Sequence, residues 1–297
     1  MIIDSRFPIK GKLDGLRIWQ CGNKTVAAVI KKDAKNPRTE SQMRQRIKMN
    51  NILDLYKCIN HALKENYEGI SGNRNAASFF RSYNLMKTPV WLTYRQKLYD
   101  QCVLAPYVVG QGKMEPIHYE FGQGVFTTDI EIGEQSVSEE TTLAELSHSI
   151  CGNNENWSHE DSLQIMLLRQ KRCMPDLQDL ENEGTKELSE IESMILTIPV
   201  MTLSGDKLSS LSLNASSTRG FSLGLCNVSG KIAVKIEDQT ANDYVYAFAA
   251  IHSRGEDYKR LCSTQELLLS DTSMYDCYTS AEALNRALQG YKPKRKR

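Results

Sequence analysis

Residues 244–252 have the sequence YVYAFAAIH, an apolar run that predicts a β-strand and is too short to cross a bilayer. Similar short runs recur from residue 107 onward, separated by clusters of Gly, Asn, Asp and Ser. Further strands are predicted at 107–109, 124–132, 162–169, 194–203, 207–213, 220–226, 231–236 and 260–269. This succession of short strands favours an antiparallel sandwich or barrel.

The chain before residue 107 has a different pattern. Alternating apolar residues within 12–30, on either side of a Gly-Asn turn, predict a β-hairpin. Thr39 and Gln42 then form a capping box, and apolar residues at steps of four or eight predict a helix that ends near Glu65. Shorter helices are predicted at 75–86, 91–101, 142–149 and 280–289. The expected fold class is α+β, an N-terminal β-hairpin and helices followed by a mainly antiparallel β-sandwich-like region.

We expect three parts in this chain. Residues 1–105 form the hairpin and helical region, residues 106–275 the antiparallel β-region, and residues 276–297 a C-terminal helix and basic tail. The segment 175–193 carries seven acids and one base, and is expected to be an exposed loop or a solvated helix. The sequence leaves open whether the β-region is one sandwich or two smaller units.

Composition and charge exclude several classes of protein. The 297 residues include 37 Lys and Arg, 36 Asp and Glu, and 40% hydrophobic residues, as in an ordinary folded protein. The formal net charge of +1 gives no reason to expect overall steering towards nucleic acid or a membrane surface. An acid, an arginine and a proline within the first eight residues argue against a secretory signal. We therefore expect a cytoplasmic protein with no membrane partner.

The cysteine pattern argues against a structural metal site. The eight cysteines include no Cys-x-x-Cys pair, which disfavours structural zinc. Their wide spacing favours free, mostly buried thiols over disulfides. His148, Cys151 and His159 lie close together beside Glu160 and Asp161, but their spacing matches no zinc signature, and polar loop residues are the favoured interpretation.

Other candidate chemistry is equally weak. Residues 220–224, GFSLG, match the Gly-x-Ser-x-Gly pattern of hydrolases, but strand-like residues follow Ser222 where a nucleophile elbow needs a helix. His61, His118 and His252 have no cysteine or carboxylate at ligand spacing, so a structural role is favoured for each. We predict no catalytic residue, no metal ligand and no cofactor, and hence a protein that is not an enzyme.

Several motifs together point to a family. A glycine-containing hairpin at 11–30 precedes the sequence Asn-Pro-Arg-Thr at 36–39, with Gln42 and Arg46 following at fixed spacing. Asn75, Phe79, Phe80 and Asn84 lie in the second helix, Trp157 and Asp161 precede a strand that ends Arg169-Gln170, and a hairpin spans 244–269. In these features the chain resembles a family of uncharacterised proteins from Bacteroidetes genomes and their phages, catalogued as a domain of unknown function. The chain departs from that family in its acidic insertion, its cysteine count and its basic tail.

The resemblance implies no activity and no catalytic residues, and suggests a phage virion or mobile-element component. The leading hypothesis is accordingly a structural or interaction protein with protein partners or self-assembly, either free in the cytoplasm or incorporated into a virion. The hairpin edge is the expected assembly surface, because an unpaired strand edge can accept a strand from a neighbour. Its residues are Leu16, Ile18, Val26, Ala28 and Ile30.

The alternative hypothesis is a nucleic-acid-binding accessory protein. Its phosphate contacts would come from the first helix and the C-terminal tail. The candidates are Arg38, Arg44, Arg46, Lys48, Lys292, Lys294, Arg295, Lys296 and Arg297. A solvated helix face and a solubilising tail are the simpler interpretation of these charges, because Tyr291 alone offers little stacking.

Overall fold

The fold comes from a computed structural model of the whole chain, which divides into two compact units, Met1–Thr39 and Glu40–Arg297. The residues that it describes are 2–3, 11–13, 15–21, 24–29, 39–70, 75–174, 188–201, 204–215, 221–236, 241–255 and 260–291. Each unit is described by itself. The division between residues 39 and 40 differs from the boundaries expected at 105 and 275.

The N-terminal unit is a four-stranded antiparallel sheet of order β1-β4-β3-β2. Its strands are β1 (Ile2–Ile3), β2 (Gly11–Leu13), β3 (Leu16–Cys21) and β4 (Lys24–Val29). The predicted hairpin is confirmed as β3 and β4, with Cys21 paired to Lys24 across a two-residue connection. Glycine suits the turn before β3, since Gly15 has a φ of 77°, a conformation that L side chains rarely adopt.

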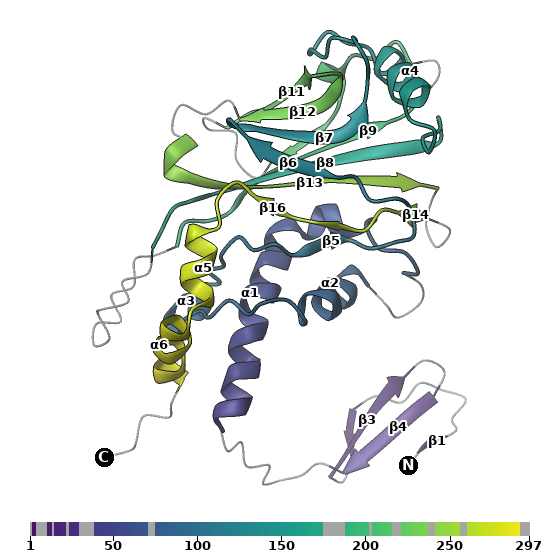
Figure 1. Cartoon of the computed structure of the whole chain (residues 1–297). Coiled ribbons are helices and arrows are strands. Elements are labelled where there is room, and N and C mark those ends of the chain that lie inside the picture. The colour runs from purple at the N-terminus through teal and green to yellow at the C-terminus, as the bar shows by residue number, and fades with distance from the viewer. Residues whose placement is uncertain are drawn as a thin grey trace. The chain divides into compact units, whose positions relative to one another are not determined.

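The second unit is built in three layers (Figure 1). A six-stranded sheet of order β10-β9-β8-β13-β14, with β16 also paired to β13, forms the middle layer. Its strands are β8 (Asp161–Lys171), β9 (Glu192–Pro199), β10 (Leu213–Ala215), β13 (Tyr244–Arg254), β14 (Leu261–Cys262) and β16 (Leu268–Leu269). Helices cover one face of this sheet and a second sheet covers the other, so the expected α+β class is confirmed.

The second sheet has the order β11-β12-β7-β6. Its strands are β6 (Tyr119–Gly122), β7 (Val125–Glu131), β11 (Leu223–Val228) and β12 (Lys231–Ile236). A further pair, β5 (Val108–Gly110) with β15 (Gln265–Glu266), lies on the helical side of the middle sheet (Figure 1). Two packed sheets thus form a single sandwich, which answers the question that the sequence left open.

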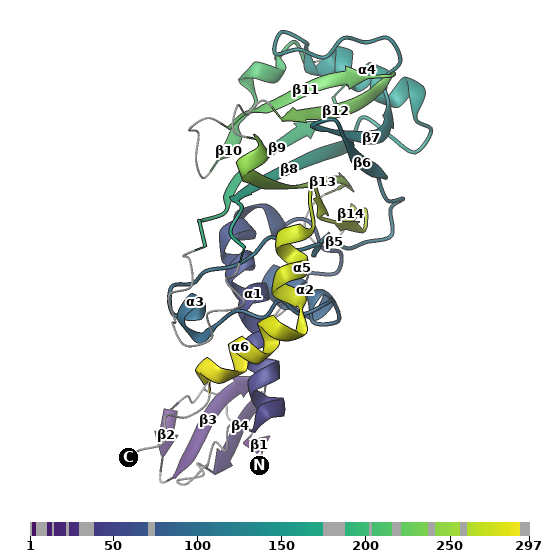
Figure 2. The ribbon, with the colours of Figure 1, turned by 60° about the vertical axis from the view of Figure 1, so that its left-hand side comes forward.

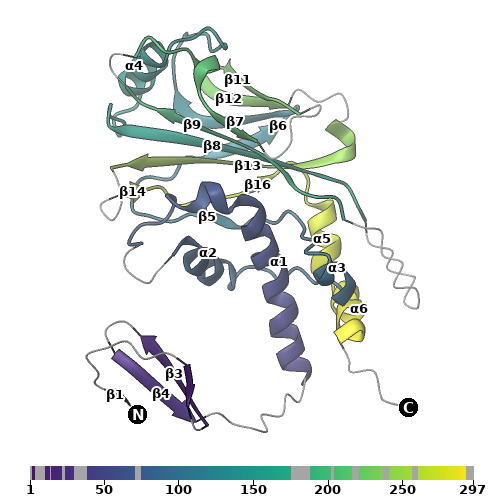
Figure 3. The same ribbon diagram turned by 180° about the vertical axis from the view of Figure 1, so that it is seen from behind.

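The helices are gathered mostly on one side of the middle sheet, as Figure 3 shows from behind. They are α1 (Glu40–Leu63), α2 (Ala76–Asn84), α3 (Tyr94–Leu98), α5 (Ser273–Thr279) and α6 (Ala281–Tyr291), while α4 (Leu143–Asn153) lies beside the second sheet. Figure 2 shows α6 beside α1, where Met43 and Ile47 pack against Ala287 and Tyr291. Among the described residues, no helix is long and apolar enough to span a membrane.

Local capping fixes where several helices begin. The hydroxyl of Thr142 accepts the backbone N–H of Glu145, and the Glu145 carboxylate accepts the N–H of Thr142, which confirms the predicted capping box of α4. Thr93 and Gln96 form the same arrangement at α3. Asn75 caps α2 by accepting the N–H of Ser78. These side chains satisfy backbone donors that the first helical turn leaves unpaired.

The central strands β8 and β13 pair along their whole length, from Asp161 opposite Arg254 to Lys171 opposite Tyr244. Successive side chains of a strand point to opposite faces, and both faces of these strands are buried. One face contributes to a core with the helices and the other to a core with the second sheet. Burial on both faces explains why residues 244–252 are apolar without alternation.

The structure corrects some boundaries. Residues 207–213 were predicted as a strand, but Leu208–Ser210 form a 3-10 helix, η1, and only Leu213 enters β10. The helical core continues across residue 105, since Leu104 and Tyr107 belong to it together with Tyr278. The expected separate C-terminal part is therefore packed into the same unit as the β-region. Of the acidic insertion, residues 175–187 lie outside the described residues.

Candidate functional site

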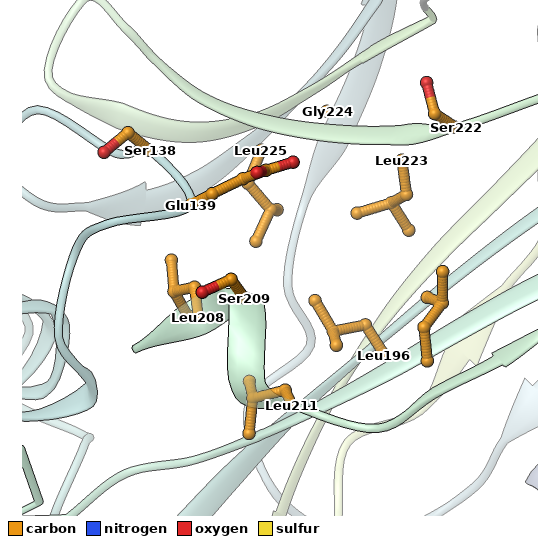
Figure 4. Close-up of a pocket in the computed structure, with 11 residues that line it drawn as sticks. Ser138, Glu139, Leu196, Leu208, Ser209, Leu211, Ser222, Leu223, Gly224 and Leu225 are labelled. Atoms are coloured by element: carbon orange, nitrogen blue, oxygen red, sulfur yellow. The ribbon is translucent and has the colours of Figure 1, made fainter. Parts of the chain in front are cut away.

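A cavity of about 340 Å³ with leucines in its lining lies between β9, η1, β10 and the start of β11. Six leucines form its walls, and we call it the leucine pocket. They are Leu196, Leu208, Leu211, Leu213, Leu223 and Leu225. Figure 4 shows Leu223 and Leu225 extending from β11 towards the leucines of β9 and η1. The strand period places these two residues on one face of β11, with Gly224 between them.

Polar groups lie around this cavity rather than within its leucine wall. They are Ser138, Glu139, Ser209 and Ser222, and Glu139 is the one charged residue of the lining. The N–H of Ser209 donates to the backbone oxygen of Glu139 (3.1 Å), which holds this acid beside η1. A mostly apolar wall with a small number of polar groups beside it is typical of sites that bind small molecules.

Ser222 lines the same pocket but does not sit in a nucleophile elbow. It is exposed and directly precedes β11, so a strand follows it where a hydrolase needs a helix. Figure 4 shows its hydroxyl pointing away from the leucines, while Leu223 points towards them. As expected, strand residues and not a helix follow Ser222, and Phe221 is buried in the sandwich core.

A second, more polar hollow of about 570 Å³ lies over β6, β7 and β12. Its lining mixes charges of both signs with hydroxyl groups, and includes His118, Glu120, Asp129, Ser229 and Lys231. The N–H of Asp129 donates to the backbone oxygen of His118 (2.9 Å), so the two residues are fixed side by side. The lining has no leucine wall and no dominant charge.

The strongest polar cluster is buried at one end of the sandwich, and we call it the Asp161 cluster. The Asp161 carboxylate lies 2.7 Å from Nε2 of His252 and accepts Nε of Arg254 at 2.5 Å. It also accepts the backbone N–H of Ser158 (2.9 Å). The indole of Trp157 stacks on the His252 ring with centroids 3.7 Å apart. Sequence spacing missed the carboxylate partner of His252, because 91 residues separate it from Asp161.

The electrostatics of this cluster are those of a structural ion pair. Burial by itself would raise the pKa of Asp161, but the hydrogen bonds from Arg254, His252 and Ser158 outweigh it and hold that pKa well below its usual range. All the oxygens of the carboxylate are occupied by these partners, and its side chain is fully buried. The cluster therefore joins the ends of β8 and β13 and leaves no carboxylate oxygen facing a cavity.

The neighbouring cysteine does not have the geometry of an activated nucleophile. Sγ of Cys151 lies 3.8 Å from Nδ1 of His159, and the His148 ring meets the His159 ring edge to face at 5.6 Å. Burial and the nearby Asp161 raise the pKa of the Cys151 thiol, which disfavours the thiolate. Within the described part of the chain, no group of three or more His, Cys, Asp or Glu side chains is arranged to hold a metal ion.

The other thiols are free as well. Seven cysteines, at 58, 102, 151, 173, 226, 262 and 277, form no disulfide, so the prediction of free thiols is confirmed for them. Only Cys102 and Cys262 are buried, which corrects the expectation that most would be. The Sγ atoms of Cys58 and Cys102 lie 3.9 Å apart.

The predicted assembly edge does not exist as one surface. β1 pairs with β4 at Val26, and β2 pairs with β3 from Leu16 to Ile18, so β3 and β4 are central strands. The two-residue connection sets Ile18 opposite Ala27 and Trp19 opposite Val26. Leu16 and Ile18 therefore lie on one face, and Val26 and Ala28 on the other. Ile30, the last of the predicted edge residues, lies outside the described residues.

The two faces of this small sheet differ in exposure near its centre, while Val29, at the end of the Ile18 face, is 75% exposed. Ile18, Thr25 and Ala27 are buried, at 7%, 3% and 4% exposure. The opposite face carries residues that we group as the Trp19 face, namely Arg17, Trp19, Lys24, Val26 and Ala28. Arg17, Lys24 and Ala28 are exposed, and Trp19 is 39% exposed. An aromatic ring and two cations thus share one accessible sheet face.

The predicted nucleic-acid contacts do not form one surface either. On α1, Arg44 and Lys48 are one helical turn apart, whereas Arg46 lies two residues from each and so on another side. Arg44 is also paired with Glu40, with Nη2 and Oε1 2.8 Å apart. Arg38 and residues 292–297 lie outside the described residues. The helix therefore presents no continuous cationic stripe.

Comparison with known proteins adds no relative. No protein-family model, no curated protein and no solved structure matches this chain.

Proposed function

We propose that this protein is a non-enzymatic structural or interaction protein that self-assembles through the Trp19 face of its N-terminal unit. The observation that carries this proposal is the asymmetry of the small sheet, which buries Ile18 and Ala27 on one face and leaves Trp19 and Arg17 accessible on the other. Tryptophan and arginine are the residue types most enriched among those that dominate binding energy at protein interfaces.

The charge distribution favours a second copy of the chain as the partner. Residues 1–39 contain nine Lys and Arg against three Asp, which gives a net charge of +6. Residues 40–297 contain the remaining 28 Lys and Arg and 33 Asp and Glu, which gives −5. The N-terminal unit of one copy is thus complementary in charge to the second unit of another. Such a contact is heterologous, and it closes into a ring or continues as a filament.

A virion or mobile-element setting belongs to the same proposal, as does a location in the cytoplasm before assembly. Its support is the family resemblance of the hairpin and of the Asn-Pro-Arg-Thr segment at 36–39.

The test is the solution mass of nuclease-treated protein, measured by light scattering at low and high salt. We expect masses above the monomer at low salt and a shift towards monomer at high salt, because charge attraction between exposed surfaces is screened. Arg17→Glu should shift the mass towards monomer at low salt, and Trp19→Ala should weaken association about tenfold or more.

The matched control is Lys64→Glu, which makes the same charge change at an exposed position of the second unit. Because it makes the second unit more negative, it should not shift the mass towards monomer. A monomer under every salt condition would overturn the proposal, and so would equal dissociation by Arg17→Glu and Lys64→Glu.

Nucleic-acid binding is the second candidate, and the +6 charge of residues 1–39 together with the accessible Trp19 ring favours it. Phosphates would meet Arg17 and Lys24 while a base stacks on the indole. The test is retention of the protein on single-stranded DNA or RNA. Nucleic-acid binding is favoured over self-assembly if the protein stays monomeric, if its retention falls with salt, and if Trp19→Ala abolishes that retention.

A further inference from the structure

We propose that the leucine pocket binds a straight aliphatic chain that ends in an amine. This site lies in the second unit, so the inference is independent of the function proposed for the Trp19 face. Its volume of about 340 Å³ falls in the range of small-molecule sites.

The walls of the pocket select an alkyl chain. All its apolar lining residues are leucines and none is aromatic, so it offers no flat surface for a ring to stack on. Leu196 and Leu208 are buried, at 7% and 8% exposure, whereas Leu213, at 41%, is the most exposed leucine of the lining. A bound alkyl chain would cover the leucine surface that water now contacts, which is the main source of favourable free energy for such a ligand.

The polar residues around the leucine wall, which form the rim of the pocket, select the charge at the end of the ligand chain. Glu139 is exposed and is the one charged residue of the lining. The neighbouring Glu140 is paired with Lys207, whereas no salt bridge with a described residue neutralises Glu139. Figure 4 shows the Glu139 side chain reaching over the leucines from the side of Ser138. An ammonium group at the end of the chain would meet this carboxylate, and a carboxylate ligand would be repelled by it.

Hydroxyl groups complete the polar end. Ser138 and Ser209 line the same rim, and each offers an acceptor for an ammonium proton. The rim is held in place by backbone hydrogen bonds between η1 and the loop that precedes α4, from Leu208 N–H to Thr141 oxygen (2.9 Å) and from Ser209 N–H to Glu139 oxygen (3.1 Å). Acceptors are thus positioned at one end of an apolar cavity.

The experiment titrates butylamine, hexylamine and octylamine into the full chain, followed by isothermal calorimetry or by chemical shifts of leucine methyl groups. Each added methylene should tighten binding by about fourfold until the pocket is full. Octylamine should bind about threefold or more tighter than octanoate, with octanol between them, since an exposed ion pair contributes modestly.

Two variants test the two halves of the site. Glu139→Gln should remove the preference for the amine over the carboxylate and keep the dependence on chain length. Leu213→Trp, at the exposed mouth, should weaken every ligand by blocking the entrance. The control Leu98→Ala removes an exposed leucine of α3 that is not part of the lining. It should change neither the preference for the amine nor the affinity for the ligands.

Three results would overturn the proposal. They are an affinity that does not rise with chain length, octanoate binding as tightly as octylamine to the unmodified protein, and an amine preference that survives in Glu139→Gln. If Leu213→Trp does not fold, the ratio of amine to carboxylate affinities in Glu139→Gln still decides the matter.

Discussion

The two faces of the middle sheet of the second unit are stabilised in different ways. On the sandwich face, β8 and β13 contribute Leu163, Ile165, Leu167, Phe248 and Ala250 to a core of aliphatic and aromatic side chains. Charged groups occur on this face at its two ends. The Asp161 cluster lies at one end, and at the other Arg169 pairs with Glu192 and lies between the rings of Phe221 and Tyr244.

The helical face instead contains buried amide side chains. Asn51 accepts the N–H of Val103 (2.7 Å) and donates to its carbonyl oxygen (3.0 Å) and to the Tyr107 hydroxyl (3.1 Å). Gln170 of β8 donates to the Cys102 carbonyl (2.7 Å) and accepts the Leu104 N–H (3.1 Å). These amides bond a segment that belongs to no helix or strand, and so satisfy backbone groups that have no ladder partner.

The difference follows from what covers each face. A covering sheet satisfies its own backbone through its ladders, so side chains need only fill volume. An irregular buried segment has donors and acceptors that need side-chain partners, because an unpaired buried polar group is costly. The sandwich face should therefore be sensitive to lost volume, and the helical face to lost hydrogen bonds.

The largest effect is expected for Phe248→Ala on the sandwich face. Phe248 is fully buried, stacks on Phe126 with centroids 5.0 Å apart and meets Tyr119 edge to face at 5.2 Å. The cavity left by alanine should lower the free energy of unfolding by about 4 kcal/mol, measured by urea denaturation. Phe248→Leu should lose much less, and a loss below about 1 kcal/mol in Phe248→Ala would show that this face does not depend on volume.

Substitutions that leave no cavity separate the two faces. Asn51→Leu keeps the branched shape of the side chain but leaves the Val103 amide and carbonyl groups without their partner, so we expect the free energy of unfolding to fall by about 3 kcal/mol. Leu167→Met on the sandwich face, which is close in size, should lower it by less than about 1.5 kcal/mol. Chemical denaturation of both variants measures the contrast. Equal losses would break the distinction between the faces.

The smallest of the three effects concerns the charged end of the sandwich face. Asp161→Asn should lower the free energy of unfolding by about 2 kcal/mol at neutral pH, because charge-assisted hydrogen bonds to Arg254 and His252 are weakened. The pKa of Asp161 is held below its unfolded value, so its contribution is complete above about pH 5 and is lost as the pH falls. The gap between the unmodified protein and the variant should therefore narrow in acid, and a gap independent of pH would contradict this assignment.

Much of the fold can be predicted from local patterns. The predicted strand at 231–236 coincides with β12, and Thr142 with Glu145 marks the start of α4. The long first helix follows from its apolar spacing, and Leu55 and Ile59, two of these apolar residues, are buried. Local patterns failed at 207–213, where Leu208–Ser210 form η1 and three leucines of the segment line the leucine pocket.

The candidate sites could be predicted less well, because they depend on register and on distant partners. The hairpin is predicted correctly, but the expected assembly edge puts Ile18 and Val26 on one surface. The two-residue connection pairs Ile18 with Ala27, so Ile18 and Val26 lie on opposite faces of the sheet. The Leu213 and Leu223 sides of the leucine pocket come from strands of different sheets, and nothing in their spacing indicates that they meet.

Local sequence patterns account for the kinds of element and their approximate positions, since strand and helix periods, turns and caps are properties of neighbouring residues. Long-range packing is what makes β8 and β13 the centre of three layers, brings Asp161 to His252, and sets six leucines around a cavity beside Glu139. Such contacts join residues that are far apart in the chain. They form because both faces of the middle sheet have to be buried at the same time, and the pattern of neighbouring residues does not specify what covers each face.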